Sequence, residues 1–198
     1  MVEIDVEELE GSLYRVLSSV VIPRPIAWVS TRSEAGVDNL APYSFFTVAS
    51  VDPPVVLFAP VDGPDGLKDT PRNARETGEF VVNLVTEDLV EAMNETAATL
   101  PAEESEFDRA GIGRVESTTV APPRVGGAKA AFECTLRELI DVGGSTLVLG
   151  DVQYVHLDES IVDPESGKVD VQDVDAVGRL AGSWYAHVDD RFSLERPP

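Results

Sequence analysis

Two short apolar runs joined by a loop constrain this chain more than any other feature of its sequence. Residues 26–31 are rich in β-forming side chains and end in Ser30 and Thr31, and a loop that contains Gly36 leads into a second run. β-formers on both sides of a short loop predict a β-hairpin. The return strand is unusual because small or polar side chains replace bulky ones at Asn39, Ala41, Ser44 and Thr47. Such a strand lets a flat ligand approach its backbone.

Acidic residues dominate the charge of the chain. The 198 residues include 36 acidic and 15 basic side chains, for a formal net charge of -21 at pH 7. A nucleic-acid-binding surface needs clustered positive charge, so the composition argues against a nucleic-acid partner. The acidic residues are spread along the chain, which favours a halophilic protein with a solvated acidic shell over an ordinary acidic protein. The length predicts one domain over residues 1–198.

The cysteine count, the apolar runs and the first residues of the chain bear on its expected location. Its one cysteine, Cys134, excludes an internal disulfide, and its alternation with Phe132 and Leu136 predicts a buried strand position rather than a nucleophile. No apolar run approaches the roughly 20 residues of a membrane span. The first residues are acidic and lack the basic region of a secretion signal. We therefore expect a cytoplasmic protein with no membrane partner.

Strand signals outnumber helix signals along the chain. Strands are predicted at residues 26–31, 42–50, 55–60, 80–85, 130–140 and 146–158, and Gly143-Gly144 predicts a hairpin turn between the last two. Thr70 followed by Pro71 predicts the start of a helix, and Gly78 predicts its end. Two further helices are expected after Thr86 and over residues 105–110. This pattern predicts a mainly β fold, a closed antiparallel barrel with a few flanking helices.

The predicted helix start near Thr70 is the best candidate for an anion site. Free N–H groups and the positive end of the helix dipole would face the preceding residues, where Lys68 adds a full charge. Arg72 and Asn73 supply further donors. Asp69 would repel a phosphate unless it caps the helix or pairs with Lys68. A capped surface helix with a nearby ion pair is the alternative, and these residues leave both interpretations open.

The two histidines do not form a metal site. His156 and His187 lie far apart and lack the spacing of metal ligands, so no metal is predicted. His156 continues the face of Val152 and Tyr154, which indicates a packed strand histidine. His187 follows a Gly-rich segment and is a weak candidate for a catalytic group. No Gly-x-Gly-x-x-Gly fingerprint is present, which argues against a Rossmann nicotinamide domain.

Several motifs, in order, resemble the flavin reductase-like family of FMN-binding split-barrel proteins, which includes flavoredoxins. They are P-R-P-I-A-W-V-S-T at 23–31, the return strand at 39–45, D-P-P at 52–54, K-D-T-x-x-N at 68–73, F-V-V-N at 80–83 and V-G-R-L-A-G-S-W-Y at 177–185. The resemblance spans about residues 15–196, and Ala181 replaces a frequent glycine. It implies an antiparallel FMN-binding split β-barrel with FMN as cofactor.

The resemblance also implies a set of flavin-binding residues, with the phosphate at the K-D-T-x-x-N segment. Arg24 or Arg179 would stabilise negative charge on reduced flavin, although Arg24 can equally pair with a carboxylate. Phe46 and Tyr185 are the aromatic side chains that flank a ring best, whereas the others are more typical of a core. The implied set is Arg24, Ser30, Thr31, Asn39, Ala41, Ser44, Phe45, Phe46, Lys68, Asp69, Thr70, Asn73, Arg179 and Tyr185.

The activity that the resemblance implies is an NAD(P)H-dependent flavin reductase. Hydride would pass from NAD(P)H to flavin N5, and electrons would continue to free flavin or to a redox partner protein. A flavoredoxin-type electron carrier without NAD(P)H activity is the first alternative, and a flavin-free binding barrel is the second. The resemblance further implies a homodimer with FMN near the subunit boundary.

Overall fold

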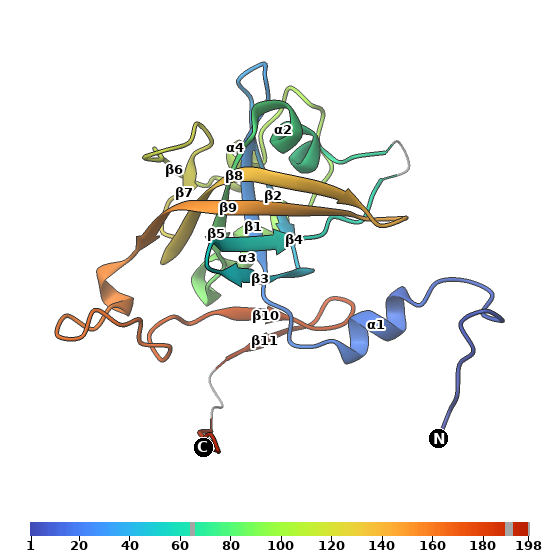
Figure 1. Ribbon diagram of the computed structural model, residues 1–198. Coiled ribbons are helices and arrows are strands. Elements are labelled where there is room, and N and C mark those ends of the chain that lie inside the picture. Colours follow the sequence, from blue (N-terminus) through green and yellow to red (C-terminus); the bar gives the residue numbers. More distant parts are fainter. Residues whose placement is uncertain (64–65, 189–191, 198) are drawn as a thin grey trace.

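The computed structural model describes residues 1–63, 66–188 and 192–197, and its main feature is a seven-stranded antiparallel sheet (Figure 1). The sheet strands are β1 Ala27–Arg32, β2 Asp38–Tyr43, β3 Phe46–Val51, β4 Pro54–Phe58, β5 Glu79–Leu84, β8 Ala130–Asp141 and β9 Thr146–Leu157. They lie in the order β2-β1-β5-β8-β9-β4-β3. Two short pairs add β6 Arg114–Val115 with β7 Arg124–Val125, and β10 Val177–Arg179 with β11 Tyr185–His187. The predicted mainly β, antiparallel fold is confirmed.

The two edge strands of the sheet follow one another directly in the chain. The sequence predicted one strand over residues 42–50, and this prediction was wrong because the strand is broken at Ser44 and Phe45. β2 pairs with β1, whereas β3 pairs with β4 at the opposite edge. The chain therefore changes its partner strand from β1 to β4 within these two residues. The same break brings Ser44 to the end of the return strand, where it faces the candidate site described below.

Helices are short and flank the sheet. They are α1 Tyr14–Val20, α2 Asp69–Thr77, α3 Val90–Glu95 and α4 Glu106–Ala110, with 3-10 turns at η1 Glu87–Leu89 and η2 Glu159–Ile161. The predicted start of α2 at Pro71 was wrong by two residues, because Lys68 is the residue before the first helical turn. Pro71 is still within the first turn, where its missing N–H has no helical acceptor to lose. The predicted end is confirmed, since Gly78 follows the helix with a φ of 78°.

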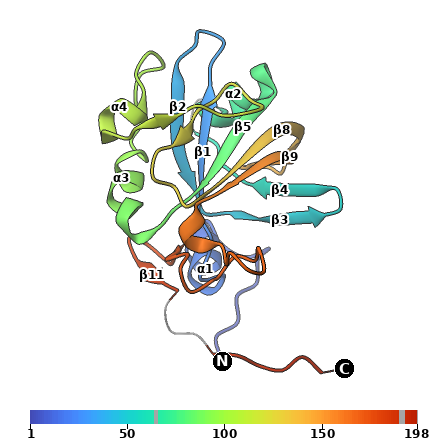
Figure 2. The same cartoon turned by 90° about the vertical axis from the view of Figure 1, so that its left-hand side faces the viewer.

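Strand β1 is buried on both faces, which explains its nearly uniform apolar sequence. Ala27 and Val29 join the main core beneath α2 with Phe58 and Phe80. Trp28 faces the other way into a second cluster, and its Nε1 donates to Thr96 Oγ1 at 2.9 Å. Figure 2 shows α3 and α4 beside β2, on the side of this second cluster. These helices therefore form an outer wall next to the return strand.

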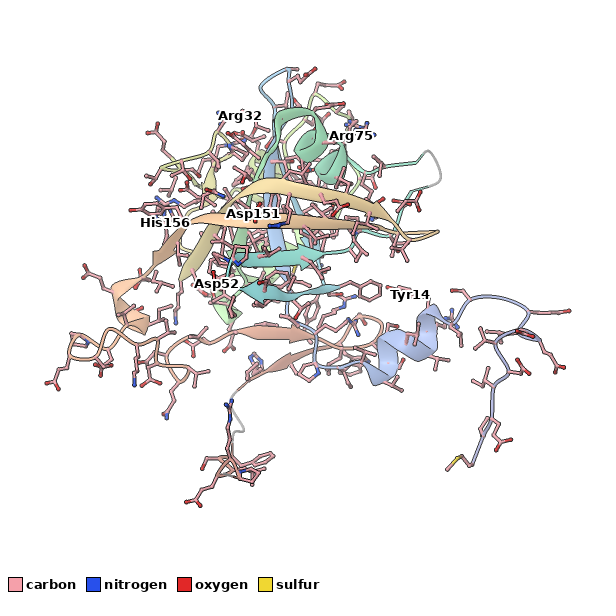
Figure 3. All side chains as sticks on the ribbon, in the orientation of Figure 1. Tyr14, Arg32, Asp52, Arg75, Asp151 and His156 are labelled. Atoms are coloured by element: carbon pink, nitrogen blue, oxygen red, sulfur yellow. The ribbon has the colours of Figure 1, made fainter. Side chains whose placement is uncertain are left out.

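A buried carboxylate links β8, β9 and the loop that precedes β7. Glu133 is fully buried, and it accepts hydrogen bonds from the backbone N–H groups of Thr118 at 2.6 Å and Thr119 at 2.5 Å. His156 Nε2 lies 2.6 Å from the same carboxylate, and its ring packs 4.8 Å from that of Tyr154, which confirms the predicted packed strand histidine (Figure 3). Burial alone would raise the pKa of Glu133, but these hydrogen bonds outweigh it and lower the pKa to about 2.

Glu133 should therefore contribute to stability at neutral pH and lose that contribution in acid. Its carboxyl pKa falls from 4.5 to about 2 on folding, so the contribution is complete above pH 4.5 and declines as the pH falls toward 2. Glu133→Gln should lower the free energy of unfolding at pH 7 by about 3 kcal/mol. Urea denaturation between pH 3 and pH 7 measures the effect, with exposed Glu138→Gln on the same strand as control. If the free energy of unfolding depends on pH in the same way for the wild type and Glu133→Gln, this prediction is wrong.

Candidate functional site

A cleft runs along the return strand β2, from the start of α2 to the β10–β11 pair. One section has a volume of about 480 Å³, and its lining includes Asn39, Ala41, Lys68, Asp69, Thr70 and Glu106. The second section has a volume of about 300 Å³, and its lining includes Tyr14, Ser18, Arg24, Ser44, Arg179 and Tyr185. Pro42 and Ala97 line both sections, so the two are neighbours along β2. Their sizes suit a small molecule or cofactor.

One end of the cleft carries the positive charge of an exposed lysine. Lys68 is exposed immediately before α2 and forms no ion pair with any residue that the structure describes. The amides of Asp69 and Thr70 belong to the first helical turn and have no acceptor within the helix. Asp69 pairs with Arg72, so it neither caps α2 nor neutralises Lys68. The helix start can thus offer an anion both N–H groups and a lysine charge.

Thr70 and Asn39 lie side by side behind this end, in a buried hydrogen-bond network. Asn39 Oδ1 accepts hydrogen bonds from Thr70 Oγ1 at 2.7 Å and from Thr31 Oγ1 at 3.3 Å. Asn39 Nδ2 donates to Glu106 Oε2 at 2.9 Å, and because a carboxylate accepts hydrogen bonds, this contact fixes the orientation of the amide. The hydroxyl hydrogen of Thr70 is therefore committed to Asn39. Asn73 Nδ2 donates to Thr31 Oγ1 at 3.1 Å and extends the network away from the cleft.

Glu106 is a site residue that the sequence analysis missed. It is the first residue of α4, and its Oε2 also accepts a hydrogen bond from the Leu40 backbone N–H at 2.9 Å. The preceding Ser105 donates its hydroxyl to the carbonyl of Asp38 at 2.6 Å. Asp38 and Leu40 belong to the edge strand β2, which has β1 as its neighbour on one side, so these contacts occupy part of its free edge. An acidic residue in a first helical turn is ordinarily explained by the helix dipole, so the sequence offered no distinctive signal.

The opposite end of the cleft is built around the buried guanidinium of Arg24. Its Nη1 donates to the carbonyls of Ser18 at 2.5 Å and Val21 at 2.9 Å, and its Nη2 donates to the carbonyl of Leu180 at 2.8 Å. Its Nε lies 3.4 Å from Ser44 Oγ. The sequence analysis allowed an ion pair for Arg24, but none of the described carboxylates pairs with it. Within the described part of the chain, backbone carbonyls rather than carboxylates therefore surround this positive charge beside the cleft.

A second arginine reinforces that charge. Arg24 and Arg179 exchange backbone hydrogen bonds, at 3.0 Å from Arg24 N and 2.8 Å from Arg179 N. The guanidinium of Arg179 lies 4.5 Å from the centre of the Tyr185 ring, and it donates to the Tyr185 hydroxyl and the Gly182 carbonyl. Burial, with a smaller contribution from Arg179, lowers the pKa of Arg24. This end of the cleft can stabilise negative charge on a bound group.

Six of the predicted flavin-binding or catalytic residues line neither section of the cleft: Ser30, Thr31, Phe45, Phe46, Asn73 and His187. Ser30 is fully buried and donates to the carbonyl of Pro123 at 2.5 Å. Phe46 packs against the main core. His187 is exposed on β11, with its Nδ1 3.5 Å from a carboxylate oxygen of Glu87. Thr31 and Asn73 belong to the network behind the cleft.

Residues 18–169 match the family described as "Flavin reductase like domain", so this chain belongs to the flavin reductase-like family. The protein YwrF of Bacillus subtilis is 44% identical over 191 residues, which cover 93% of each chain. The structure of nitrilotriacetate monooxygenase component B from Bacillus cereus is 35% identical, with a TM-score of 0.94 and 98% of each chain covered. A split barrel domain from Shewanella frigidimarina, 22% identical over 96% of each chain with a TM-score of 0.84, shares the fold.

The family match confirms the resemblance on which the split-barrel prediction was based. The fold is an antiparallel split β-barrel in which β2 and β3 are consecutive edge strands. Within the part of the chain that the structure describes, no helix has the length and apolar character needed to cross a membrane.

Proposed function

We propose that this protein binds FMN in the cleft along β2 and acts as a flavin-dependent oxidoreductase. The observation that supports this most is the placement of two cationic ends on two neighbouring cleft sections that share Pro42 and Ala97. Lys68 and the first turn of α2 form one end, and Arg24 with Arg179 forms the other. FMN carries a phosphate at one end and a ring that gains negative charge on reduction at the other. The donor chemistry of both ends fits these groups.

The wall between the two ends also suits a flavin. Ala41 and Pro42 present small side chains to the cleft, so a flat apolar ring can approach the strand closely. Ser44 Oγ and the hydroxyl of Tyr185 add polar groups near the arginine end. Lys68 and the α2 amides would hold the phosphate, whereas Arg24 and Arg179 would face the ring end. When bound, FMN would transfer electrons from NAD(P)H to free flavin or to a redox partner protein.

An electron carrier of flavoredoxin type is the second candidate function. A surface hollow of about 840 Å³ adjoins Arg179 and Tyr185, and three carboxylates line it: Asp88, Glu91 and Glu95. Negative charge beside the ring end would repel the phosphates of NAD(P)H and slow its approach. High salt would screen this repulsion, which favours the reductase in a halophilic setting.

The reaction of the FMN-loaded protein with reduced nicotinamides separates the two candidates. We expect NADH, NADPH or both to bleach bound FMN under anaerobic conditions in molar salt. Photoreduction of the same sample is the control, because it shows that the bound FMN can be reduced. If neither nucleotide bleaches the flavin while light does, the protein is an electron carrier and the reductase proposal is wrong.

The surface around α1 supports a homodimer whose assembly depends on salt. Apolar side chains are exposed on this helix and on the β10–β11 connection, among them Leu17, Val20 and Trp184. Subunits that each carry a net charge of -21 repel one another at low ionic strength, and salt screens that repulsion. Sedimentation should therefore show a dimer in molar salt that dissociates as salt is removed. A 21.3 kDa species as the only form at high salt would contradict the dimer.

A further inference from the structure

The two carboxylate oxygens of Glu106 have different surroundings. Its side chain is nine-tenths or more buried, and Oε2 accepts the hydrogen bonds from both Leu40 N and Asn39 Nδ2. Oε1 accepts no hydrogen bond from the residues that the structure describes. An ionised carboxylate has about four acceptor positions, so Oε1 retains its full capacity. Among the described residues, Asn73 Oδ1 is the fully buried side-chain oxygen without a partner, so Glu106 Oε1 is open to the hollows that Glu106 lines and can accept a hydrogen bond from a ligand there.

The position of Glu106 indicates what kind of donor this is. Glu106 lines the same section of the cleft as Lys68, and Pro42 leads from there to the arginine end. A phosphate oxygen cannot donate to a carboxylate and would be repelled by it. The neutral donor that belongs between a phosphate and a ring is a hydroxyl group.

We propose that Glu106 Oε1 accepts a hydrogen bond from a hydroxyl on the ribityl chain of the bound flavin. This inference rests on the proposed function and adds a ligand contact to it. The bonds from Leu40 and Asn39 hold the carboxylate in place before the ligand arrives, so little side-chain freedom is lost on binding. Glu106 thereby selects a polyhydroxylated side chain and is a specificity-determining residue.

Three flavins separate the ribityl contact from the other contacts of the site. FMN has the ribityl chain and the phosphate, riboflavin has the chain alone, and lumiflavin has neither. Glu106→Gln keeps an oxygen for Leu40 and Asn39 but replaces the charged acceptor in the cleft with a neutral amide. It should weaken riboflavin binding on the order of tenfold and leave lumiflavin binding unchanged. FMN should lose less, because removing the carboxylate also relieves repulsion of the phosphate.

Fluorescence titrations of the wild type, Glu106→Gln and Glu103→Gln with the three flavins provide the test. Glu103 is an exposed carboxylate that does not line the cleft, so its variant controls for the loss of one charge. Equal weakening of riboflavin and lumiflavin by Glu106→Gln, or no weakening of either, would overturn the proposal. If Glu106→Gln does not fold, Glu106→Asp withdraws the carboxylate by one methylene and should weaken riboflavin and FMN but not lumiflavin. A wild type that binds none of the three flavins would contradict the proposed function instead.

Discussion

Replacing Lys68 by alanine should weaken FMN binding by about tenfold and leave riboflavin binding almost unchanged. Lys68 at the start of α2 forms no ion pair with a described residue, and riboflavin lacks the phosphate that its charge would contact. Because Lys68 is exposed, solvent and salt weaken its interaction, so the expected loss lies at the lower end for a charge-assisted hydrogen bond. Fluorescence titration with both ligands at one fixed salt concentration measures the difference.

Two further variants identify the origin of that effect. Lys168→Ala removes an exposed lysine that lines neither section of the cleft, so it should change neither affinity. Thr70→Val should weaken both ligands alike, because the Thr70 hydroxyl donates to Asn39 and shapes the cleft wall rather than contacting an anion. A Lys68→Ala variant that binds FMN and riboflavin with equally reduced affinity would place the phosphate elsewhere.

Gly150→Ala should lower the free energy of unfolding by about 3 kcal/mol, the largest stability effect expected from one added methyl group. A Cβ at this position of β9 would lie 2.9 Å from Phe80 Cε1 and 3.1 Å from Cys134 Cβ, and still closer to Phe80 Cζ. Phe80 cannot move aside, because it is fully buried and its ring packs edge-on against Phe58 at 5.5 Å. Urea denaturation measures the loss.

Gly144→Ala is the matched control for this effect. An added Cβ at Gly144 would meet no atom within 4 Å. The residue lies in the turn between β8 and β9, and Gly150 belongs to β9. Its stability should stay within about 0.5 kcal/mol of the wild type. A Gly150→Ala protein as stable as Gly144→Ala would contradict the packing described for the main core.

Elements whose signals lie within a few residues were predictable from the sequence. The Gly143-Gly144 turn joins β8 and β9 as expected, and Gly78 ends α2. The break at Ser44 and Phe45 was not predictable, because β-formers flank it and its cause is a change of partner strand from β1 to β4. Helix α1 was also missed, since it has only seven residues, its N-cap residue Leu13 offers no side-chain cap and much of its surface is exposed.

The candidate site also has parts that the sequence predicted and parts that it did not. The lysine end was predicted because Lys68 and the helix start are adjacent in the chain. Glu106 was missed because it meets Asn39 across 67 residues, a contact that local patterns do not encode. For Arg24 the sequence left a flavin contact and an ion pair open; no described carboxylate pairs with it, and backbone carbonyls from α1 and from the β10–β11 connection orient its guanidinium beside the cleft. Tertiary contacts, rather than residue type, define these roles.

Titration of the purified protein with FMN in molar salt tests the central claim most directly. The cleft between Lys68 and the Arg24–Arg179 pair should bind FMN saturably, with one FMN per chain at the end point. Absorbance and fluorescence of the flavin both report the complex, and excess free phosphate should weaken it by competing at the lysine end. A protein that shows no saturable binding of FMN at any salt concentration would contradict the account.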